Sequence, residues 1–231
     1  MSNRTQDRAA LLGRADADVT KIESEYQASL HARAIAASLR IDIKNLLENL
    51  RSVLDYLAQD IHAKYCPKAN ATDRFYFPLL PDRKQFEARM KQWYPGLDLA
   101  AKPLWDFLES IQPYHAGFEW LGSFNRVNNE NKHTALVEQT RVEVEQVRAT
   151  MPGGGSVSWN PASVRFGPGV SIGGVPVDPS TQMPVPHPAL KVERVTWVDF
   201  EFAGIGVSAL GLLKAAVPGI KGIVTQVEQH L

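Results

Sequence analysis

Residues 43–65 read IKNLLENLRSVLDYLAQDIHAKY, and this stretch decides the fold. Apolar side chains recur in it every three or four residues, which is the spacing of one face of an α-helix. They are Ile43, Leu46, Leu47, Leu50, Val53, Leu54, Leu57, Ile61 and Tyr65. Pro67 ends the pattern, because proline cannot continue a helix. The stretch predicts a long amphipathic helix whose apolar face packs in a core or against a second copy of the chain.

Further helices are predicted on both sides of this one. Asp18 is a suitable N-cap for a helix with Val19, Ile22, Tyr26 and Leu30 on one face, either separate from the long helix or continuous with it. Three shorter helices are expected at residues 84–93, from Pro103 to the Gln112–Pro113 pair, and at residues 116–125. Together these segments indicate an antiparallel helical bundle.

The periodicity changes in the last third of the chain. Residues 151–231 hold 12 of the 16 glycines and 9 of the 15 prolines, which makes this part rich in turns. Apolar and polar residues alternate in several short segments, as in half-buried strands. These segments are residues 142–145, 157–159, 170–172 and 192–202. They predict a small antiparallel sheet that opens with a hairpin, and the proline-rich residues 176–188 are interpreted as a connecting loop.

Residues 203–227 are strongly apolar and predict a buried terminal helix. Lys214 and Lys221 interrupt the segment well within the length of about 20 apolar residues that a membrane span requires. Gly204 and Gly206 suit a turn from strand to helix, and Pro218 suits the first turn of a second helical piece. We therefore expect no membrane partner.

The charge balance restricts the classes of partner. The 231 residues include 25 Lys and Arg and 25 Asp and Glu, so the formal net charge is zero. Sequence-independent nucleic-acid binding draws on a strong positive field, so any contact with RNA would be local. Cys66 is the single cysteine and excludes an internal disulfide, and the N-terminus lacks the apolar core of a signal peptide. A cytoplasmic protein is expected.

These observations predict an α+β fold. We expect an antiparallel helical bundle in residues 1–137 and a β-rich segment in residues 138–203. Residues 204–231 would form a C-terminal helix that packs back on the bundle or on the sheet.

Polar side chains concentrate in residues 125–133, NRVNNENKH. Lys132 and His133 place a cation and a titratable imidazole close to the carboxylate of Glu130, a combination suited to positioning and cleaving a phosphate ester. The run fits a polar helix end equally well, in which Arg126 pairs with Glu130 at the i,i+4 spacing. Both interpretations stay open at this point.

Arg51 and Asp55 lie four residues apart on one face of the long helix, close to Asn49. Their apolar neighbours place them at the edge of the core, facing residues 125–133. A half-buried Arg–Asp pair needs polar partners to offset its desolvation. Candidate partners are Gln112, Lys132 and His133. The pair predicts a clamp that locks two helices together, or else the wall of a pocket for a phosphate or carboxylate.

Four short motifs occur in the first part of the chain. They are NLRSVLDYL at residues 49–57, Phe77-Pro78, Gln112-Pro113-Tyr114 and Asn131-Lys132-His133. In this order and spacing they resemble a group of uncharacterised bacterial proteins that carry NLRSALDH, FPI, QPY and DKHR. The resemblance covers about residues 40–137. Because the group has no settled activity, the resemblance implies a fold more than a function.

The wider resemblance is to HEPN domains, helical bundles that commonly dimerise. Many of them cleave RNA without a metal through an Arg, four to six residues, then His, and six residues separate Arg126 from His133. In such a ribonuclease His133 would act as general acid or base on the ribose 2′-hydroxyl, and Arg126 would stabilise the charged phosphorane. Val127 departs from the motif, which usually has a polar residue there, and Asn128 and Asn129 are poor helix formers.

Two functions are therefore expected. One is a HEPN-like interaction or scaffold protein whose polar cluster is structural, and the balanced charge and Val127 favour it. The predicted members of this cluster are Asn49, Arg51, Asp55, Gln112, Tyr114, Glu130, Lys132 and His133. The other is a metal-independent ribonuclease of the toxin or defence kind. An enzyme predicts that Arg126 and His133 are accessible and close together, whereas a clamp predicts that both are buried against Arg51 and Asp55.

A homodimer is the expected assembly, with a partner protein or RNA as further partners. No cofactor is expected. The histidines lack the spacing of metal ligands, so no metal site is expected either.

Overall fold

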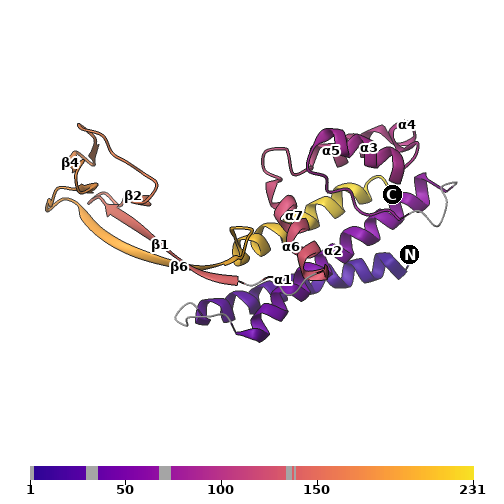
Figure 1. Ribbon diagram of the computed structural model, residues 1–231, viewed down its shortest axis with the longest axis horizontal. Coiled ribbons are helices and arrows are strands. Elements are labelled where there is room, and N and C mark those ends of the chain that lie inside the picture. The colour runs from indigo at the N-terminus through magenta and orange to yellow at the C-terminus, as the bar shows by residue number, and fades with distance from the viewer. Residues whose placement is uncertain (1–2, 30–35, 68–73, 134–136, 138) are drawn as a thin grey trace. The chain divides into compact units, whose positions relative to one another are not determined.

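The computed structural model describes residues 3–29, 36–67, 74–133, 137 and 139–231 (Figure 1). Within these ranges, the side chains of Ser29, Lys132, His133, Val144 and residues 195–198 lie outside the description. The chain divides into two compact units, one formed by Met1–Thr140 with Phe200–Leu231 and the other by Arg141–Asp199. Helices, then small antiparallel sheets, then a C-terminal helix confirm the α+β class.

Helices build the first unit. They are α1 (Asn3–Ser29), α2 (Ala37–Tyr65), α3 (Arg83–Trp93), α4 (Leu97–Ala100), α5 (Lys102–Ser110), α6 (Glu119–His133) and α7 (Ala209–Glu228). The long helix predicted over residues 43–65 is confirmed as α2, and its apolar stripe is buried from Leu39 to Ile61. This stripe lies in the core that α2 shares with α1, α6 and α7. The helices predicted near residues 84–93 and from Pro103 are confirmed as α3 and α5.

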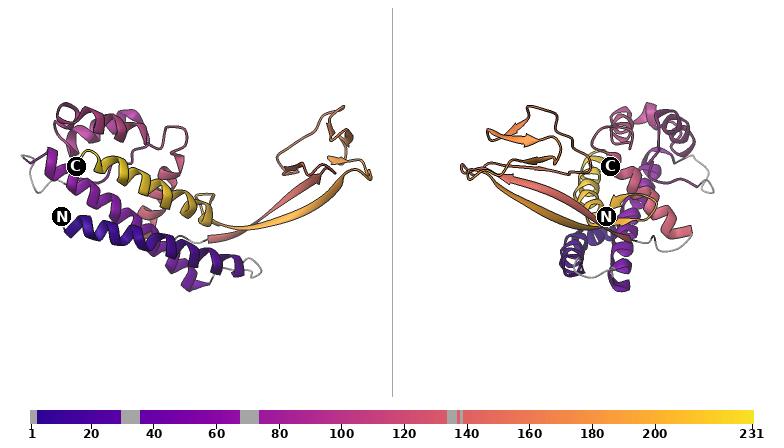
Figure 2. Two further views of the ribbon diagram at one scale, coloured as in Figure 1. Left: turned by 180° about the vertical axis from the view of Figure 1, so that it is seen from behind. Right: turned by 60° about the vertical axis from the view of Figure 1, so that its left-hand side comes forward.

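Ion pairs along α1 give the directions of the neighbouring helices. Lys21–Asp42 and Arg8–Asp60 join α1 to α2, and they show that the two helices are antiparallel. Further pairs join α1 to α7 in the same antiparallel sense, so α2 and α7 run parallel (Figure 2). These pairs are Arg8–Glu228, Asp16–Lys221 and Glu23–Lys214. The termini of the described chain therefore meet at one end of the unit.

The first helix begins much earlier than the sequence predicted. Asp18, expected as an N-cap, lies inside α1, where its carboxylate accepts a hydrogen bond from Arg14. The residues before it are held by tertiary contacts, because Arg8 and Ala15 are 3% and 1% exposed. Packing against α2 and α7 thus extends the helix beyond any local start signal. Leu30, predicted on the same face, lies outside the described residues.

The helix predicted over residues 116–125 is α6, which begins later and continues to His133. Leu121, Phe124 and Val127 are all 0% exposed, so one apolar face continues into the polar run. Asn128 is also buried, and its Nδ2 donates to the carbonyl of Phe124 at 2.9 Å. Tertiary burial therefore overrides the low helix propensity of the asparagines.

The terminal helix is continuous. Ser208 caps α7 by accepting a hydrogen bond from Gly211, after a turn in which Gly204 and Gly206 adopt the left-handed φ values of 71° and 70°. The prediction that a second helical piece begins at Pro218 is wrong, because Pro218 lies inside α7. By length and composition alone α7 would fit a membrane span. Ten of its residues are buried in the core of the helical unit.

Strands build the second unit. The predicted hairpin is confirmed as β1 (Gln139–Thr150) and β2 (Ser156–Trp159), with Thr150 opposite Ser156. The alternating residues 192–202 form β6 (Lys191–Phe202). Three further strands of this unit are β3 (Ser171–Ile172), β4 (Val175–Asp178) and β5 (Met183–Pro184), whereas β7 (Val207–Ser208) belongs to the first unit and pairs with Glu201 and Phe202 at the end of β6. They give sheet orders β2-β1-β6-β7 and β3-β4-β5, so the segment expected as a plain loop at residues 176–188 carries strand residues.

Candidate functional site

Arg51 is the centre of the candidate site. It projects from α2 and is only 8% exposed. Its Nε donates to Asp55 Oδ2 at 3.2 Å, one helical turn further on. Its Nη1 donates to Asn125 Oδ1 on α6 at 3.1 Å. As the sequence predicted, the Arg–Asp pair faces residues 125–133, and Asn125 is the residue that makes the contact.

The second oxygen of Asp55 depends on the charge of Arg51. Asp55 Oδ1 lies 3.0 Å from Arg51 Nη2, a distance that qualifies as an ion pair. The angles are unsuitable for a hydrogen bond, and this buried oxygen has no hydrogen-bond partner among the described residues. A buried carboxylate oxygen without a donor is costly unless a cation lies close to it. Each of Arg51 and Asp55 therefore offsets the cost of burying the charge of the other.

A pocket of about 510 Å³ opens beside this pair. Its lining combines polar side chains from α2 and α6 with aromatic and apolar side chains from α3 and the segment before it. The lining residues are Arg51, Tyr76, Phe77, Leu79, Trp93, Asn125 and Asn129. The pocket thus has one hydrogen-bonding side and one aromatic side.

The aromatic side is held in place by its neighbours. Tyr76 is 45% exposed and meets Trp93 edge to face, with the ring centroids 6.0 Å apart. Tyr94 is completely buried, and its hydroxyl donates to the backbone carbonyl of Tyr76 at 2.8 Å. Burial raises the pKa of Tyr94 well above its usual value, which keeps this hydroxyl protonated as a donor.

The clamp interpretation predicted that Arg126 is buried against Arg51 and Asp55, and this is wrong: Arg126 lies next to this pocket and does not belong to the Arg51 cluster. Its side chain is 54% exposed, its Nε donates to Glu130 Oε1 at 3.0 Å, and its Nη2 donates to the carbonyl of Gly204 at 2.8 Å. Arg126 and Glu130 line a second pocket of about 740 Å³. Leu79, Asn125 and Asn129 line both pockets, so the two are neighbours.

The other half of the predicted catalytic pair lies outside the described side chains. Lys132 and His133 form the last turn of α6, and only their backbone is described. Because α6 is unbroken, the backbone positions 126 and 133 are about two turns apart on the same side of the helix. Val127, the departure from the ribonuclease motif, is 0% exposed and serves the core.

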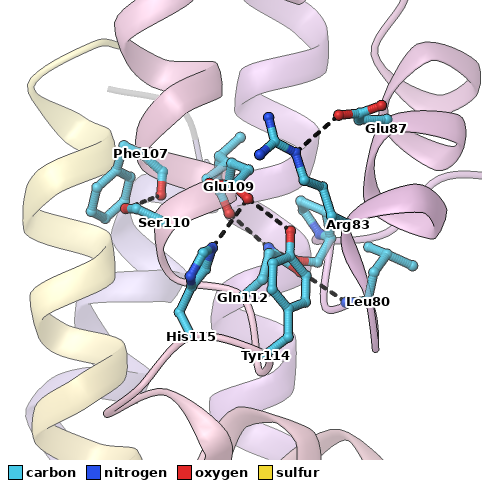
Figure 3. Close-up of polar contacts among 11 residues, drawn as sticks. Leu80, Arg83, Glu87, Phe107, Glu109, Ser110, Gln112, Tyr114 and His115 are labelled. Carbon is cyan, nitrogen blue, oxygen red and sulfur yellow. Dashed lines mark hydrogen bonds and ion pairs between the residues drawn. The ribbon is translucent and has the colours of Figure 1, made fainter.

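Gln112, a predicted member of the cluster, lies elsewhere (Figure 3). It is 0% exposed, and its Nε2 donates to the carbonyls of Pro78 at 2.9 Å and Leu108 at 2.7 Å. Its Oε1 accepts a hydrogen bond from the backbone N–H of Leu80 at 2.9 Å. Gln112 therefore fastens the segment before α3 to the end of α5, and it does not contact Arg51 or Asp55.

Tyr114, also predicted for the cluster, points toward Glu109 from the loop after α5 (Figure 3). Its hydroxyl donates to Glu109 Oε1 at 3.1 Å, and His115 Nε2 lies 3.1 Å from the same oxygen. Partial burial and this carboxylate raise the pKa of Tyr114 above its usual value. Arg83 and Glu87 form an exposed pair on α3 close by.

Asn49 faces a third surface. It lines a pocket of about 330 Å³ with Arg14, Asp18 and Lys21, between α1 and α2. The predicted residues therefore separate into distinct places: Arg51 with Asp55, Arg126 with Glu130, Gln112, Tyr114 and Asn49. The pocket beside Arg51 adjoins the pocket beside Arg126 and Glu130, because Asn125 and Asn129 line both.

The sequence did not identify the aromatic side of the pocket, formed by Tyr76 and Trp93. Tyr76 and Trp93 belong to different segments and carry no shared periodicity, although the dense aromatic run Phe75-Tyr76-Phe77 was a signal. Asn125 was inside the polar run, but nothing in the run distinguished it from its neighbours. Among the described residues no group of three or more His, Cys, Asp or Glu side chains is placed to hold a metal ion.

Comparisons with protein-family models, with curated proteins and with solved structures found no match. The fold and the contacts of the described residues are therefore the basis for assigning a role.

Proposed function

We propose that this protein is a HEPN-like interaction or scaffold protein in which Arg51 and Asp55 form a structural clamp between α2 and α6. The observation that carries the proposal is the pair of partners that engage the buried Arg51 guanidinium, Asp55 on α2 and Asn125 on α6. An interior ion pair of this kind fixes the register of packed helices.

The motif residues that carry the family resemblance support the same role. Arg51 and Asp55 come from the NLRSVLDYL motif and hold α2 to α6. Gln112 comes from the Gln-Pro-Tyr motif and satisfies three backbone groups. Motif residues that make such hydrogen bonds support a structural role. Each one satisfies buried polar groups whose burial without a partner would destabilise the fold.

A metal-independent ribonuclease is the second candidate. It is favoured by the unbroken α6, which places residues 126 and 133 on one face, and by the exposure of Arg126 at the edge of a pocket. Against it, Glu130 and the carbonyl of Gly204 already engage the Arg126 guanidinium. A guanidinium neutralised by a carboxylate has less charge to offer a phosphorane.

The proposal includes a homodimer in the cytoplasm. The dimer rests on the HEPN resemblance, because the apolar stripe of α2 is occupied by the core of its own unit. Light scattering after size-exclusion chromatography measures it directly. A mass of twice 25.6 kDa supports the dimer, and a mass of 25.6 kDa at all concentrations removes it.

Incubation of a mixed RNA pool with the purified protein in EDTA separates the two candidates. The variants are His133→Ala and Arg126→Ala, with Arg83→Ala as the matched control, because Arg83 also makes an exposed i,i+4 pair, with Glu87 at 3.1 Å. The scaffold role predicts no cleavage by any of the proteins. Cleavage that leaves 2′,3′-cyclic ends, and that is lost in folded His133→Ala and Arg126→Ala but kept in Arg83→Ala, would establish the ribonuclease.

A further inference from the structure

The pocket beside Arg51 has a feature that the clamp does not explain, which is an excess of hydrogen-bond donors. Arg51 has donors only, and although its Nε and Nη1 are engaged by Asp55 and Asn125, each Nη carries two N–H groups. Asn125 uses its Oδ1 to accept from Arg51, so its Nδ2 is the group left for a ligand. Trp93 adds an indole N–H, which is also a donor only. Within the described residues Asn129 makes no hydrogen bond, so its amide is open to the pocket.

The pocket carries little net charge. The carboxylate of Asp55 lies 3.0 Å from the Arg51 guanidinium and neutralises it. The remaining lining side chains, which are amides, aromatics and aliphatics, are uncharged. Among the described side chains that line the pocket, a phosphate or carboxylate would therefore lose its hydration without meeting an unpaired cation. A neutral ligand with many acceptors and few donors matches the lining better.

The opposite side of the pocket offers aromatic surface. Tyr76 and Trp93 stand at 75° to one another, and Arg89 lies over the Trp93 ring at 5.8 Å from its centroid. Phe77 and Leu79 form an apolar floor. Tyr94 fixes the backbone of Tyr76, so this surface exists before a ligand arrives and little ordering is needed on binding.

We propose that the pocket between Tyr76, Trp93 and Asn125 binds a proline-rich segment of a partner protein in the polyproline II conformation. Such a segment presents backbone carbonyls that make no internal hydrogen bonds, and each proline lacks an N–H. It is therefore rich in acceptors and poor in donors, as the lining requires. Proline rings pack against aromatic-lined grooves, and the preformed helix loses little entropy on binding.

This inference rests on the proposed interaction role and gives the partner a chemical class. The contiguous pocket beside Arg126 and Glu130 gives an extended segment a path along α6. Asn125 and Asn129 are four residues apart on α6, about 6 Å along its axis, which matches the separation of carbonyls two residues apart in a polyproline II segment with its rise of about 3.1 Å.

The test is a titration of the full-length protein, labelled with ¹⁵N, with decaproline. A Gly-Ser peptide of equal length is the control, because it offers carbonyls without a preformed helix or rings. Two variants remove the proposed contacts without touching the core: Tyr76→Ala at a side chain that is 45% exposed, and Asn129→Ala at an exposed position of α6. Asn45→Ala is the matched control, since Asn45 is also exposed and helical and lines a different pocket.

We expect decaproline, and not the Gly-Ser peptide, to shift the side-chain amide signals of Asn125 and Asn129. Tyr76→Ala should weaken binding about tenfold or more, Asn129→Ala should weaken it less, and Asn45→Ala and Tyr76→Phe should bind like wild type. The inference is overturned if decaproline does not bind, if all variants bind it equally, or if the shifted signals lie only on other surfaces.

A failure of this kind leaves the scaffold role intact if no RNA is cleaved. Cleavage that requires Arg126 and His133 would instead remove the scaffold role, whatever decaproline does. The two proposals therefore fail through separate measurements.

Discussion

Arg8 on α1 and Glu228 at the end of α7 are 220 residues apart in the sequence, and their side chains are joined by a hydrogen bond of 2.7 Å. Arg8 Nη1 also donates to Asp60 Oδ2 on α2, again at 2.7 Å. Arg8 is only 3% exposed, so a single guanidinium connects three helices inside the first unit. Its role is the same as that of Arg51, which connects α2 to α6.

Replacing Arg8 should therefore destabilise the fold. Arg8→Ala removes the cation beside Asp60, which is 14% exposed and retains Arg4 as a partner. We expect the free energy of unfolding to fall by about 2–4 kcal/mol, at the lower end of the cost of breaking a buried pair. Urea denaturation followed by circular dichroism measures it. Arg14→Ala, at an α1 side chain that is 76% exposed, should change stability by less than about 0.5 kcal/mol, and equal effects of the two would contradict the assignment.

The contact between α6 and α7 is equally specific. A Cβ atom on Gly219 would lie 2.3 Å from Trp120 Cζ2, so Gly219→Ala must displace the indole ring. Overpacking of this kind should cost about 1–3 kcal/mol. Gly222 lies in the same helix, and its added Cβ would meet nothing within 4 Å. Gly222→Ala should therefore raise the free energy of unfolding, measured by urea denaturation, by about 0.5–1 kcal/mol. A Gly219→Ala variant that is more stable than the wild type would contradict this close packing of α6 and α7.

The Arg51 clamp can be measured by a double-mutant cycle. Arg51→Ala and Asn125→Ala remove the two partners of the 3.1 Å hydrogen bond, so their effects on unfolding should not add. We expect a coupling energy of about 1 kcal/mol or more between them. The cycle of Arg51→Ala with Asn45→Ala should be additive, because Asn45 lines a different pocket. Additivity in both cycles would remove the clamp.

The start of α3 should give the protein a dependence on acid pH. Asp82 caps the helix by accepting a hydrogen bond from the Gln85 N–H at 2.8 Å, and this bond lowers the pKa of Asp82 below its ordinary value of 3.8. A carboxyl whose pKa is depressed in the folded state stabilises the fold above its unfolded pKa, and this contribution is lost as the pH falls through the folded value. Asp82→Asn keeps an oxygen acceptor and removes the charge. Its unfolding midpoint should therefore vary less with pH below about 4 than that of the wild type.

The secondary structure was predictable where an apolar periodicity is bounded by proline or glycine. The stripe of α2 ends at Pro67, and the alternation of β6 is flanked by glycine and proline, so both elements lie where the sequence places them. The start of α1 and the end of α6 were not predictable, because contacts with other helices override weak local propensity. Pro218 misled for a related reason, since the helix around it is held by ten buried side chains.

The candidate site was predictable only in part. The i,i+4 spacing of Arg51 and Asp55 and their place at the edge of the stripe indicated which way they face. Asn125, 74 residues away, had no signal of its own, because three asparagines follow it within six residues. The aromatic wall required the tertiary structure, since Tyr76 and Trp93 meet only after α3 has packed.

The position of α7 after the β-rich unit in the sequence has a consequence for assembly on the ribosome. Until residues 209–228 have emerged, the apolar faces of α1, α2 and α6 that contact α7 stay uncovered, and Arg8 lacks Glu228. The nascent bundle therefore presents the apolar residues of α2 to the cellular environment while the β-rich unit is being translated. Chains interrupted before α7 should be substrates for chaperones and proteases, and only chains translated through this helix can complete the bundle.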